Sequence, residues 1–180
     1  MEGHLLSTTR NARCVQPLPI FVTKGTAEGN TTLSAFDGAL GKAGISNCNL
    51  IRLSSVIPLG VTKVIIGKPR GLSTPEKFGN RLYVVYARQD EKEPGKQACA
   101  GLGWALTTKD PRYGLFIEHE GRNKKDIVDD IHRSLLCMIE RREKEFRHSF
   151  GKIQYLTSSI VCKKNPVCAV VVAVYKDEPW

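Results

Sequence analysis

A long amphipathic segment between two groups of strand-like segments sets the strongest limit on how this chain can fold. Asn123 can cap a helix that runs to Phe146. The apolar residues of this segment recur with a period of 3.6 residues: Ile127, Ile131, Leu135, Met138 and Ile139. The strand-like segments cluster before and after the helix and do not alternate with helices. This order predicts an α+β fold in which a layered sandwich of β-sheets is flanked by helices (αββα-like), as a single domain over residues 1–180.

The remaining elements follow from local patterns. A shorter helix is expected after Thr31 or Thr32 as its cap, and Gly44 is suited to end it. Its expected apolar face consists of Leu33, Phe36, Leu40 and Ala43. Strands are expected over 15–22, 48–57, 61–66, 82–87, 98–107, 114–119, 152–161 and 167–175. The polar stretches 25–30, 67–80 and 89–96 are expected to be loops or turns.

Composition narrows the function classes only slightly. The net charge of +9 permits binding to nucleic acid, because clustered Lys and Arg neutralise phosphates. The densest basic segment, 141–147, is interrupted by Glu143 and Glu145, which is typical of a solvated helix face. Aromatic residues make up 7% of the chain, and no stacking motif lies among the basic residues. We therefore expect no nucleic-acid partner.

Location and metal binding are also predicted from absences in the sequence. No stretch approaches the roughly 20 apolar residues of a membrane span, and residues 1–13 lack the apolar core of a secretion signal. We expect a cytoplasmic protein with no membrane partner. The six cysteines form no CxxC pair, so no metal site is expected.

One segment carries a chemical signature. Between residues 44 and 58 lie Gly44, Asn47, Asn49, Leu50, Ile51, the pair Ser54-Ser55, and Pro58. Here the sequence resembles the pyruvoyl-dependent arginine decarboxylases. The helix segment 35–40 before this motif and the segment 114–118 after it are also similar to that family, and the likeness covers roughly 15–176 except 60–80. A Ser-Ser pair alone would be a weak signal; the surrounding motif gives it meaning.

The resemblance implies that the chain cleaves itself between Ser54 and Ser55, giving fragments 1–54 and 55–180. The residue types suit this chemistry, since an N-to-O acyl shift needs a β-hydroxyl after the cut, which Ser55 supplies. Ser54 contributes only its carbonyl. The resulting ester would eliminate and hydrolyse, so that Ser55 becomes a covalent pyruvoyl group at the start of the larger fragment.

The resemblance also implies the reaction and its residues. The expected enzyme is a carboxy-lyase that converts L-arginine to agmatine and carbon dioxide through a Schiff base on the pyruvoyl group, which acts as an electron sink as PLP does. Glu118 is expected to donate a proton to the decarboxylated carbon, because a carboxyl group beside an apolar strand is desolvated. Asp37 is expected to hold the guanidinium of the substrate. The charge of +9 opposes a cationic substrate at long range, although salt screens this effect.

Asn49 is the other expected site residue, as an amide donor to a carbonyl. If 49–55 is one extended strand, Asn49 and Ser55 share a face but lie about 20 Å apart. Either the chain bends before Ser55, or Asn49 serves the site of a neighbouring subunit. The resemblance implies a trimer, or a dimer of trimers, with sites at subunit interfaces, and this favours the second option.

Two alternatives remain open at this point. The chain could be a pyruvoyl-dependent decarboxylase of another amino acid, such as histidine, which a substrate screen would separate. It could instead be a basic nucleic-acid-binding protein in which the serines are structural. That alternative predicts an intact chain of 180 residues and salt-dependent binding to DNA or RNA.

Overall fold

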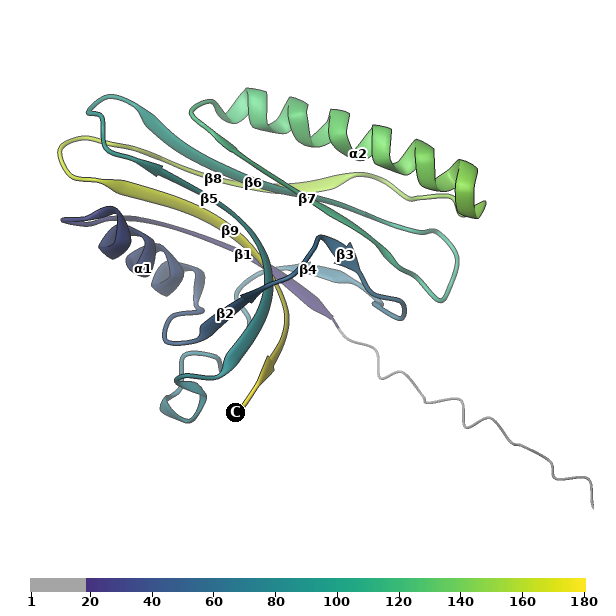
Figure 1. The fold of residues 1–180 in the computed structure, drawn as a ribbon, viewed down its shortest axis with the longest axis horizontal. Helices are drawn as coiled ribbons and strands as arrows, with labels where there is room; N and C mark the ends of the chain where they lie inside the picture. The colour runs from purple at the N-terminus through teal and green to yellow at the C-terminus, as the bar shows by residue number, and fades with distance from the viewer. Residues whose placement is uncertain (1–18) are drawn as a thin grey trace, which may run out of the picture.

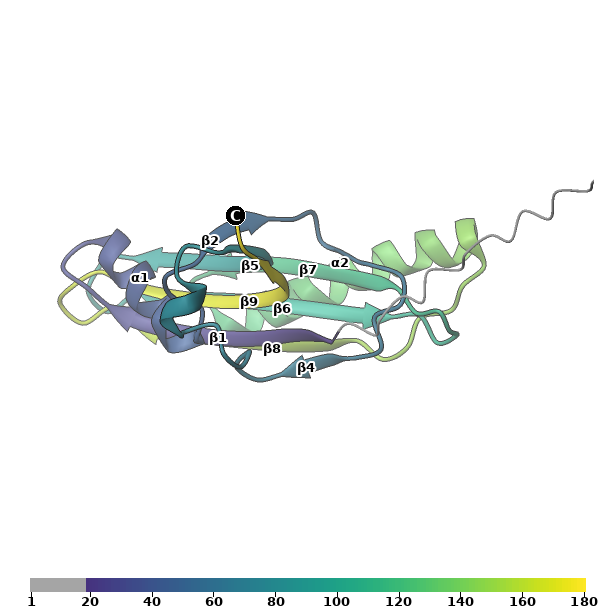
Figure 2. The ribbon, with the colours of Figure 1, turned by 90° about the horizontal axis from the view of Figure 1, so that it is seen from below.

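The computed structural model describes residues 19–180, which form four layers. Figures 1 and 2 show helix α1, a first sheet, a second sheet and helix α2 in that order. The predicted α+β sandwich with a helix on each outer side is therefore confirmed. Of the predicted strand 15–22, residues 15–18 lie outside the described part of the chain.

The first sheet has the strand order β2-β5-β9-β1-β4 and is called sheet A below. Its strands are β1 (Ile20–Glu28), β2 (Asn49–Arg52), β4 (Val64–Ile66), β5 (Arg81–Glu91) and β9 (Val167–Glu178). β9 pairs antiparallel with β1 on one side and β5 on the other. β2 lies at one edge of this sheet, parallel to β5.

The second sheet, sheet B, has the strand order β3-β7-β6-β8 and is antiparallel throughout. Its strands are β3 (Val56–Ile57), β6 (Gln97–Leu106), β7 (Gly114–Gly121) and β8 (Gln154–Val161). β3 is an edge strand like β2, so the segment from β2 to β3 runs from the edge of one sheet to the edge of the other.

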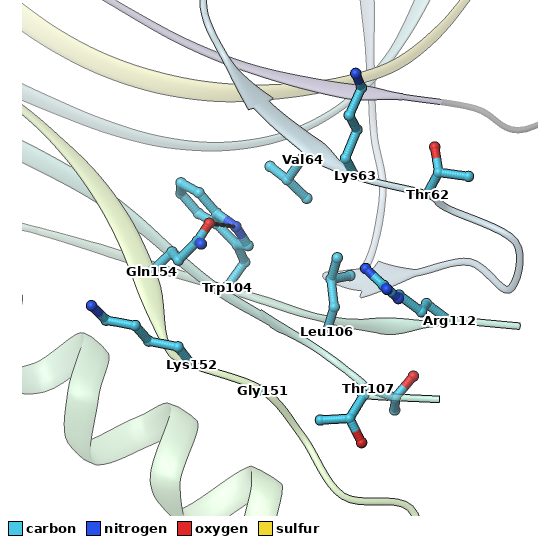
Figure 3. A pocket seen from close by; sticks show the side chains of 11 residues that line it. Thr62, Lys63, Val64, Trp104, Leu106, Thr107, Arg112, Gly151, Lys152 and Gln154 are labelled. Atoms are coloured by element: carbon cyan, nitrogen blue, oxygen red, sulfur yellow. Dashed lines mark hydrogen bonds between the residues drawn. The ribbon is translucent and has the colours of Figure 1, made fainter. Parts of the chain in front are cut away.

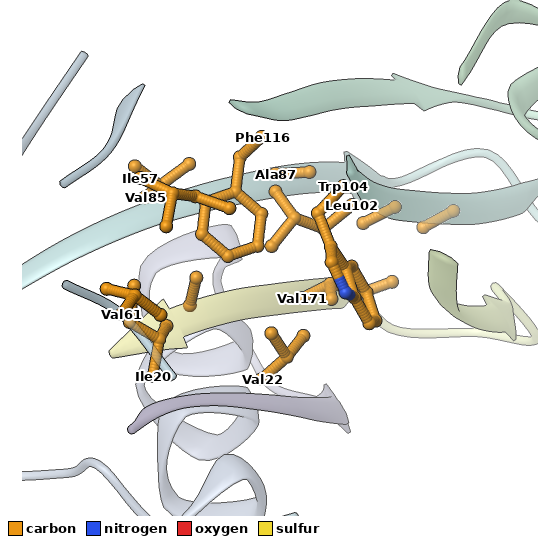
Figure 4. Packing of buried hydrophobic residues seen from close by; sticks show 14 of the residues in the cluster. Ile20, Val22, Ile57, Val61, Val85, Ala87, Leu102, Trp104, Phe116 and Val171 are labelled. Carbon is orange, nitrogen blue, oxygen red and sulfur yellow. The ribbon is translucent and has the colours of Figure 1, made fainter. Parts of the chain in front are cut away.

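Apolar side chains from both sheets form the core between them. Trp104 and Phe116 are its largest fully buried side chains, and their ring centroids lie 6.1 Å apart. Figure 4 shows these rings from sheet B meeting Val22, Val85 and Val171 from sheet A. Burial of this continuous layer of aromatic and β-branched residues holds the sheets face to face.

The two helices begin where the sequence predicts. α1 (Thr32–Ala43) has Thr31 as its N-cap, and Gly44 ends it with φ 80° in the left-handed region. α2 (Lys124–Phe146) has Asn123 as its N-cap. Its buried residues Ile127, Ile131 and Leu135 pack on sheet B, as the periodicity predicts.

The predicted apolar face of α1 was wrong only at Leu33, since Ala43 is buried and Phe36 and Leu40 are partly buried against the same cluster. Ala35, Ala39 and Ala43 are buried against sheet A, whereas Leu33 is 70% exposed. The helix lies very close to β1. A Cβ at Gly25 would collide with the carbonyl oxygen of Ala39, so there is no room for a side chain at this position. This close approach selects alanines for the contact face. It also explains why 25–28 belongs to β1 and not to the predicted loop.

Three other boundaries differ from the prediction. β5 continues to Glu91 although 89–96 was expected to be a turn, because the buried Glu91 pairs with Arg122 at 2.6 Å. The predicted loop 67–80 contains a short 3-10 helix, η1 (Pro75–Lys77). Most important for the site, the predicted strand 48–57 is two strands in different sheets, β2 and β3. Within residues 19–180, none of the helices is long and apolar enough to cross a membrane.

Candidate active site

The Ser54-Ser55 pair lies where the chain passes from one sheet to the other. The Leu53 N–H still donates to the Val84 carbonyl of sheet A at 2.8 Å, and Val56 already pairs with Leu115 of sheet B. The chain bends at Ser55 between these points. The peptide bond between Ser54 and Ser55 thus lies outside both regular ladders.

A carboxylate stands beside the hydroxyl of Ser55. The Ser55 hydroxyl donates to Glu118 Oε2 at 2.5 Å, across 63 residues of sequence. Glu118 lies on β7 with 17% of its side chain exposed, and Arg52 Nη2 lies 3.8 Å from its other oxygen. A nucleophile and a base in hydrogen-bond contact, with a cation orienting the base, form the arrangement needed to activate a hydroxyl.

Backbone groups surround the same bond. The Val56 N–H donates to the Ser54 carbonyl at 2.6 Å, closing a three-residue turn centred on Ser55. The Phe116 N–H donates to the Ser55 carbonyl at 2.8 Å. The Tyr175 hydroxyl, from sheet A, donates to the Val56 carbonyl at 3.1 Å. The carbonyl that must accept negative charge during cleavage therefore already has a donor.

Of the predicted site residues, the structure brings Ser54, Ser55 and Glu118 together. Asn49 is exposed at the start of β2, and its amide donates to the Gly79 carbonyl at 2.6 Å. Within residues 19–180 of this single chain, no hydrogen bond joins Asn49 to Ser55. The roles of these residues stay predictions.

Asp37 lies on the exposed side of α1, outside sheet A. Its neighbour Phe36 packs on Tyr86 at 6.4 Å between ring centroids, and the Arg52 guanidinium lies 5.0 Å from the centre of the Tyr86 ring. α1 is thus linked to the site through Tyr86 and Arg52. Asp37 itself has no hydrogen bond or ion pair to the site within the described part of this chain.

His119 follows Glu118 on the opposite face of β7. Its ring nitrogen lies 3.0 Å from the Ser134 hydroxyl of α2. This agrees with the alternation of a strand, which places His119 away from the site.

An apolar cavity of about 410 Å³ adjoins the bend. Its lining residues are Ile20, Leu53, Pro58, Val61, Tyr83, Tyr175 and Lys176. Among the described residues, Lys176 is the one charged residue in this lining, so that part of the chain offers no carboxylate here to a guanidinium. A second hollow of about 430 Å³, drawn in Figure 3, lies between β4 and sheet B. Its lining includes Trp104 and Arg112 but neither Ser55 nor Glu118, so it is not part of this site.

Sequence reasoning missed Arg52 and Tyr175. Arg52 lies inside the motif between residues 44 and 58, but a lone arginine on a strand gives no signal of a function. Tyr175 is 120 residues from Ser55 in sequence, and only the packing of the two sheets brings its hydroxyl to the Val56 carbonyl. Among residues 19–180, no three His, Cys, Asp or Glu side chains are grouped so that they could hold a metal ion.

Comparison with known proteins decides the family. A family model described as pyruvoyl-dependent arginine decarboxylase matches residues 19–179, almost the whole described chain. This chain belongs to that family. It is therefore an enzyme, a decarboxylase that depends on a covalently bound pyruvoyl group.

Curated relatives support the same assignment. A protein of Thermococcus kodakarensis named pyruvoyl-dependent arginine decarboxylase is 33% identical over 160 residues, covering 88% of this chain and 94% of the relative. A protein of the same name from Methanocaldococcus jannaschii is 36% identical over 120 residues, 66% of this chain and 68% of the relative. A solved pyruvoyl-dependent histidine decarboxylase aligns with a TM-score of 0.41 and 11% identity, over 60% of this chain and 58% of that one. A likeness at that level does not bear on the substrate.

Proposed function

We propose that this protein cleaves itself between Ser54 and Ser55 and then converts L-arginine to agmatine and carbon dioxide. One observation carries the proposal. The Ser55 hydroxyl donates to Glu118 at 2.5 Å at a bend that lies outside both sheets. The site thus combines a nucleophile, a base and a carbonyl that already accepts a backbone hydrogen bond, which are the requirements for an acyl shift.

The proposed cleavage proceeds through an ester and then a dehydroalanine. Glu118 takes the proton of the Ser55 hydroxyl, and Oγ attacks the Ser54 carbonyl carbon. The C–N bond breaks, the Ser55 nitrogen takes a proton, and an ester remains. Loss of the Ser55 α-proton breaks the Cβ–Oγ bond, which leaves a Ser54 carboxylate and a dehydroalanine. Water then replaces the nitrogen, releasing ammonia and leaving the ketone of a pyruvoyl group.

The residues around Ser55 suit such a group. The Phe116 N–H would still hold the carbonyl of residue 55, and Glu118 would lie beside the new methyl ketone. When formed, the pyruvoyl group binds the α-amino group of the substrate and accepts the electrons released as carbon dioxide leaves. Glu118, having served as base during cleavage, would donate a proton to the decarboxylated carbon.

The side chain of arginine needs a second carboxylate, which residues 19–180 of one chain do not bring to the site. Asp37 is the proposed partner of the guanidinium, supplied by a neighbouring subunit, because its own α1 lies on the outer side of sheet A. A bidentate pair between a carboxylate and a guanidinium would orient the substrate. The amide of Asn49 would reach the pyruvoyl carbonyl in the same way, from another copy.

Exposed apolar residues around the site support an oligomer, which we propose to be a trimer or a dimer of trimers. Val56 is 51% exposed and Ile51 36% exposed, both on edge strands beside the bend. Leu33 on α1 is 70% exposed. Edge strands and apolar side chains left open in one chain are typical of surfaces covered by another subunit. The cytoplasmic location stays a prediction.

The first test is a denaturing intact-mass spectrum of the purified protein, followed by an assay for agmatine and carbon dioxide. Fragments 1–54 and 55–180 are expected, the larger one lighter by about 17 Da than a serine-started chain because ammonia is lost. Arginine should be consumed, and histidine should not. A chain that stays intact after long incubation under native conditions would contradict the proposal.

A second experiment tests the shared site. Asn49→Ala and Ser55→Ala proteins, each inactive alone, are co-expressed so that mixed oligomers form. Recovered activity is expected, since one copy then supplies Ser55 and the next supplies Asn49. Absence of any recovery in oligomers shown to be mixed would place Asn49 in its own subunit's site or outside it.

A further inference from the structure

Tyr175 extends toward the scissile turn from the inner face of β9, next to an irregularity in its pairing with β5. The register of β9 against β5 shifts between Tyr83, which faces Lys176, and Val84, which faces Val174. Tyr175 is the extra residue of this β-bulge, with no partner on β5. Its side chain lies on the same face of β9 as Val171 and Ala173, which belong to the core between the two sheets. Here the Tyr175 side chain lies toward sheet B, with its ring 6.0 Å from that of Phe116.

The hydroxyl of Tyr175 then spans the two sheets. It donates to the carbonyl of Val56 at 3.1 Å, so a residue of β9 holds a residue of β3. Its pKa is raised by burial and, secondarily, by the nearby charge of Glu118, so it stays a protonated donor at physiological pH.

Hydrogen bonds hold the peptide units around Val56, whereas packing holds the next residue, Ile57, which is fully buried. The Val56 side chain is 51% exposed, so little packing fixes it. Instead, the Phe116 N–H holds the Ser55 carbonyl at 2.8 Å, and Tyr175 holds the Val56 carbonyl. Between these two anchors lies the Val56 N–H, which points at the Ser54 carbonyl at 2.6 Å.

We infer that Tyr175 is a positioning residue for self-cleavage: by fixing the Val56 carbonyl, it aims the Val56 N–H at the Ser54 oxygen, where negative charge develops. This inference rests on the proposed function. The donor to the oxyanion is the backbone N–H of Val56, which no side-chain substitution can remove. Side chains can only change how well this N–H is aligned with the Ser54 oxygen. Removal of one oxyanion donor costs about 10²–10³-fold in rate, and loss of alignment should cost part of that.

Tyr83 offers a matched control. It lines the same cavity as Tyr175, on the neighbouring strand β5. Its hydroxyl donates to Glu178 at 2.8 Å and not to the turn. Tyr175→Phe and Tyr83→Phe therefore each remove one hydroxyl from the same region, and only Tyr175→Phe removes a contact with the scissile segment.

The experiment follows cleavage of the full chain from the moment of synthesis, by pulse-labelled cell-free translation and denaturing gels. Wild type, Tyr175→Phe, Tyr83→Phe and Ser55→Ala are compared, and thermal midpoints are measured on the purified proteins. We expect cleavage of Tyr175→Phe to be slower by about tenfold or more, and that of Tyr83→Phe to stay within about twofold of wild type. The midpoints of the two Phe variants should be similar.

The outcomes separate this inference from the proposed function. If wild type is never cleaved, the proposed function itself fails. If wild type is cleaved and Tyr175→Phe matches it within twofold, only the positioning role is overturned. A slow Tyr175→Phe protein whose thermal midpoint lies far below that of Tyr83→Phe also overturns the positioning role, because the hydroxyl would then serve the stability of the fold.

Discussion

The chain contains two Ser-Ser pairs, and the structure places them in opposite environments. Ser158-Ser159 lies inside β8, where both residues pair regularly with Ala100 and Cys99 of β6. Ser54-Ser55 lies between β2 and β3, outside either ladder. The same dipeptide is therefore structural in one place and a candidate for chemistry in the other.

The partners of the two hydroxyls explain the difference. The Ser158 hydroxyl is buried and donates to the Gly25 carbonyl at 3.1 Å, a contact that joins the two sheets. The Ser55 hydroxyl donates to the Glu118 carboxylate at 2.5 Å. A carbonyl cannot remove the proton of a hydroxyl, whereas a carboxylate can. A bend and a base, and not the dipeptide, distinguish the reactive pair.

The largest expected effect tests this contrast directly. Ser55→Ala should abolish cleavage, because alanine has no hydroxyl to attack the Ser54 carbonyl. Ser159→Ala, at the second residue of the other pair, should cleave like wild type. Intact-mass spectra of both proteins after equal incubation give the answer. Cleavage of the Ser55→Ala protein at the same bond would mean that another group performs the attack.

The second prediction concerns the base. Glu118→Gln keeps the shape of the side chain but cannot take the Ser55 proton, so cleavage should slow by about 10²–10⁴-fold. Glu120→Gln is the matched control, because Glu120 is exposed two residues further along the same face of β7. Time courses of fragment formation measure both rates. Equal rates for the two variants would show that the contact between Ser55 and Glu118 is not used.

Much of this contrast could not be predicted from the sequence. The helix caps Thr31, Asn123 and Gly44 were predicted correctly, since caps depend on neighbours within a few residues. The break at Ser54-Ser55 was only one of two options, because the apolar and β-branched residues on both sides of the serines also suit one continuous strand. Which sheet edge each half joins depends on contacts far away in the chain.

The candidate site shows the same limit. Ser55 and Glu118 were selected through family resemblance, and their contact is visible only in three dimensions. Tyr175 gave no signal, because an apolar strand ending in tyrosine is common and its contact with Val56 depends on how the two sheets pack. Asn49 and Asp37 stay predictions, since a single chain does not contain the surfaces that a neighbouring subunit would add.

The third prediction extends the contrast to the substrate. Asp37→Ala should raise the KM for arginine by about 10–100-fold, because a hydrogen bond to a charged group contributes about 1.5–3 kcal/mol. Cleavage should be unchanged, since Asp37 does not contact the bend. Asp129→Ala, an exposed carboxylate on α2 in the opposite outer layer, is the control. Steady-state kinetics on fully cleaved protein measure the effect, and a KM equal to that of the control would remove Asp37 from the substrate site.

The smallest expected effect concerns the other pair, Ser158-Ser159, and is a change in stability and not in cleavage. Ser158→Ala loses a buried hydrogen bond to the Gly25 carbonyl, so the free energy of unfolding should fall by about 0.5–1.5 kcal/mol. For a chain of this size, each kcal/mol of lost stability lowers the melting temperature by roughly 2–4 °C. Cleavage and decarboxylation should be untouched, because the hydroxyl is far from any base. Calorimetry on the uncleaved Ser55→Ala protein, with and without Ser158→Ala, measures this loss of unfolding free energy separately from any effect of cleavage. A change in cleavage rate with unchanged stability would instead give Ser158 a chemical role and end the contrast between the two pairs.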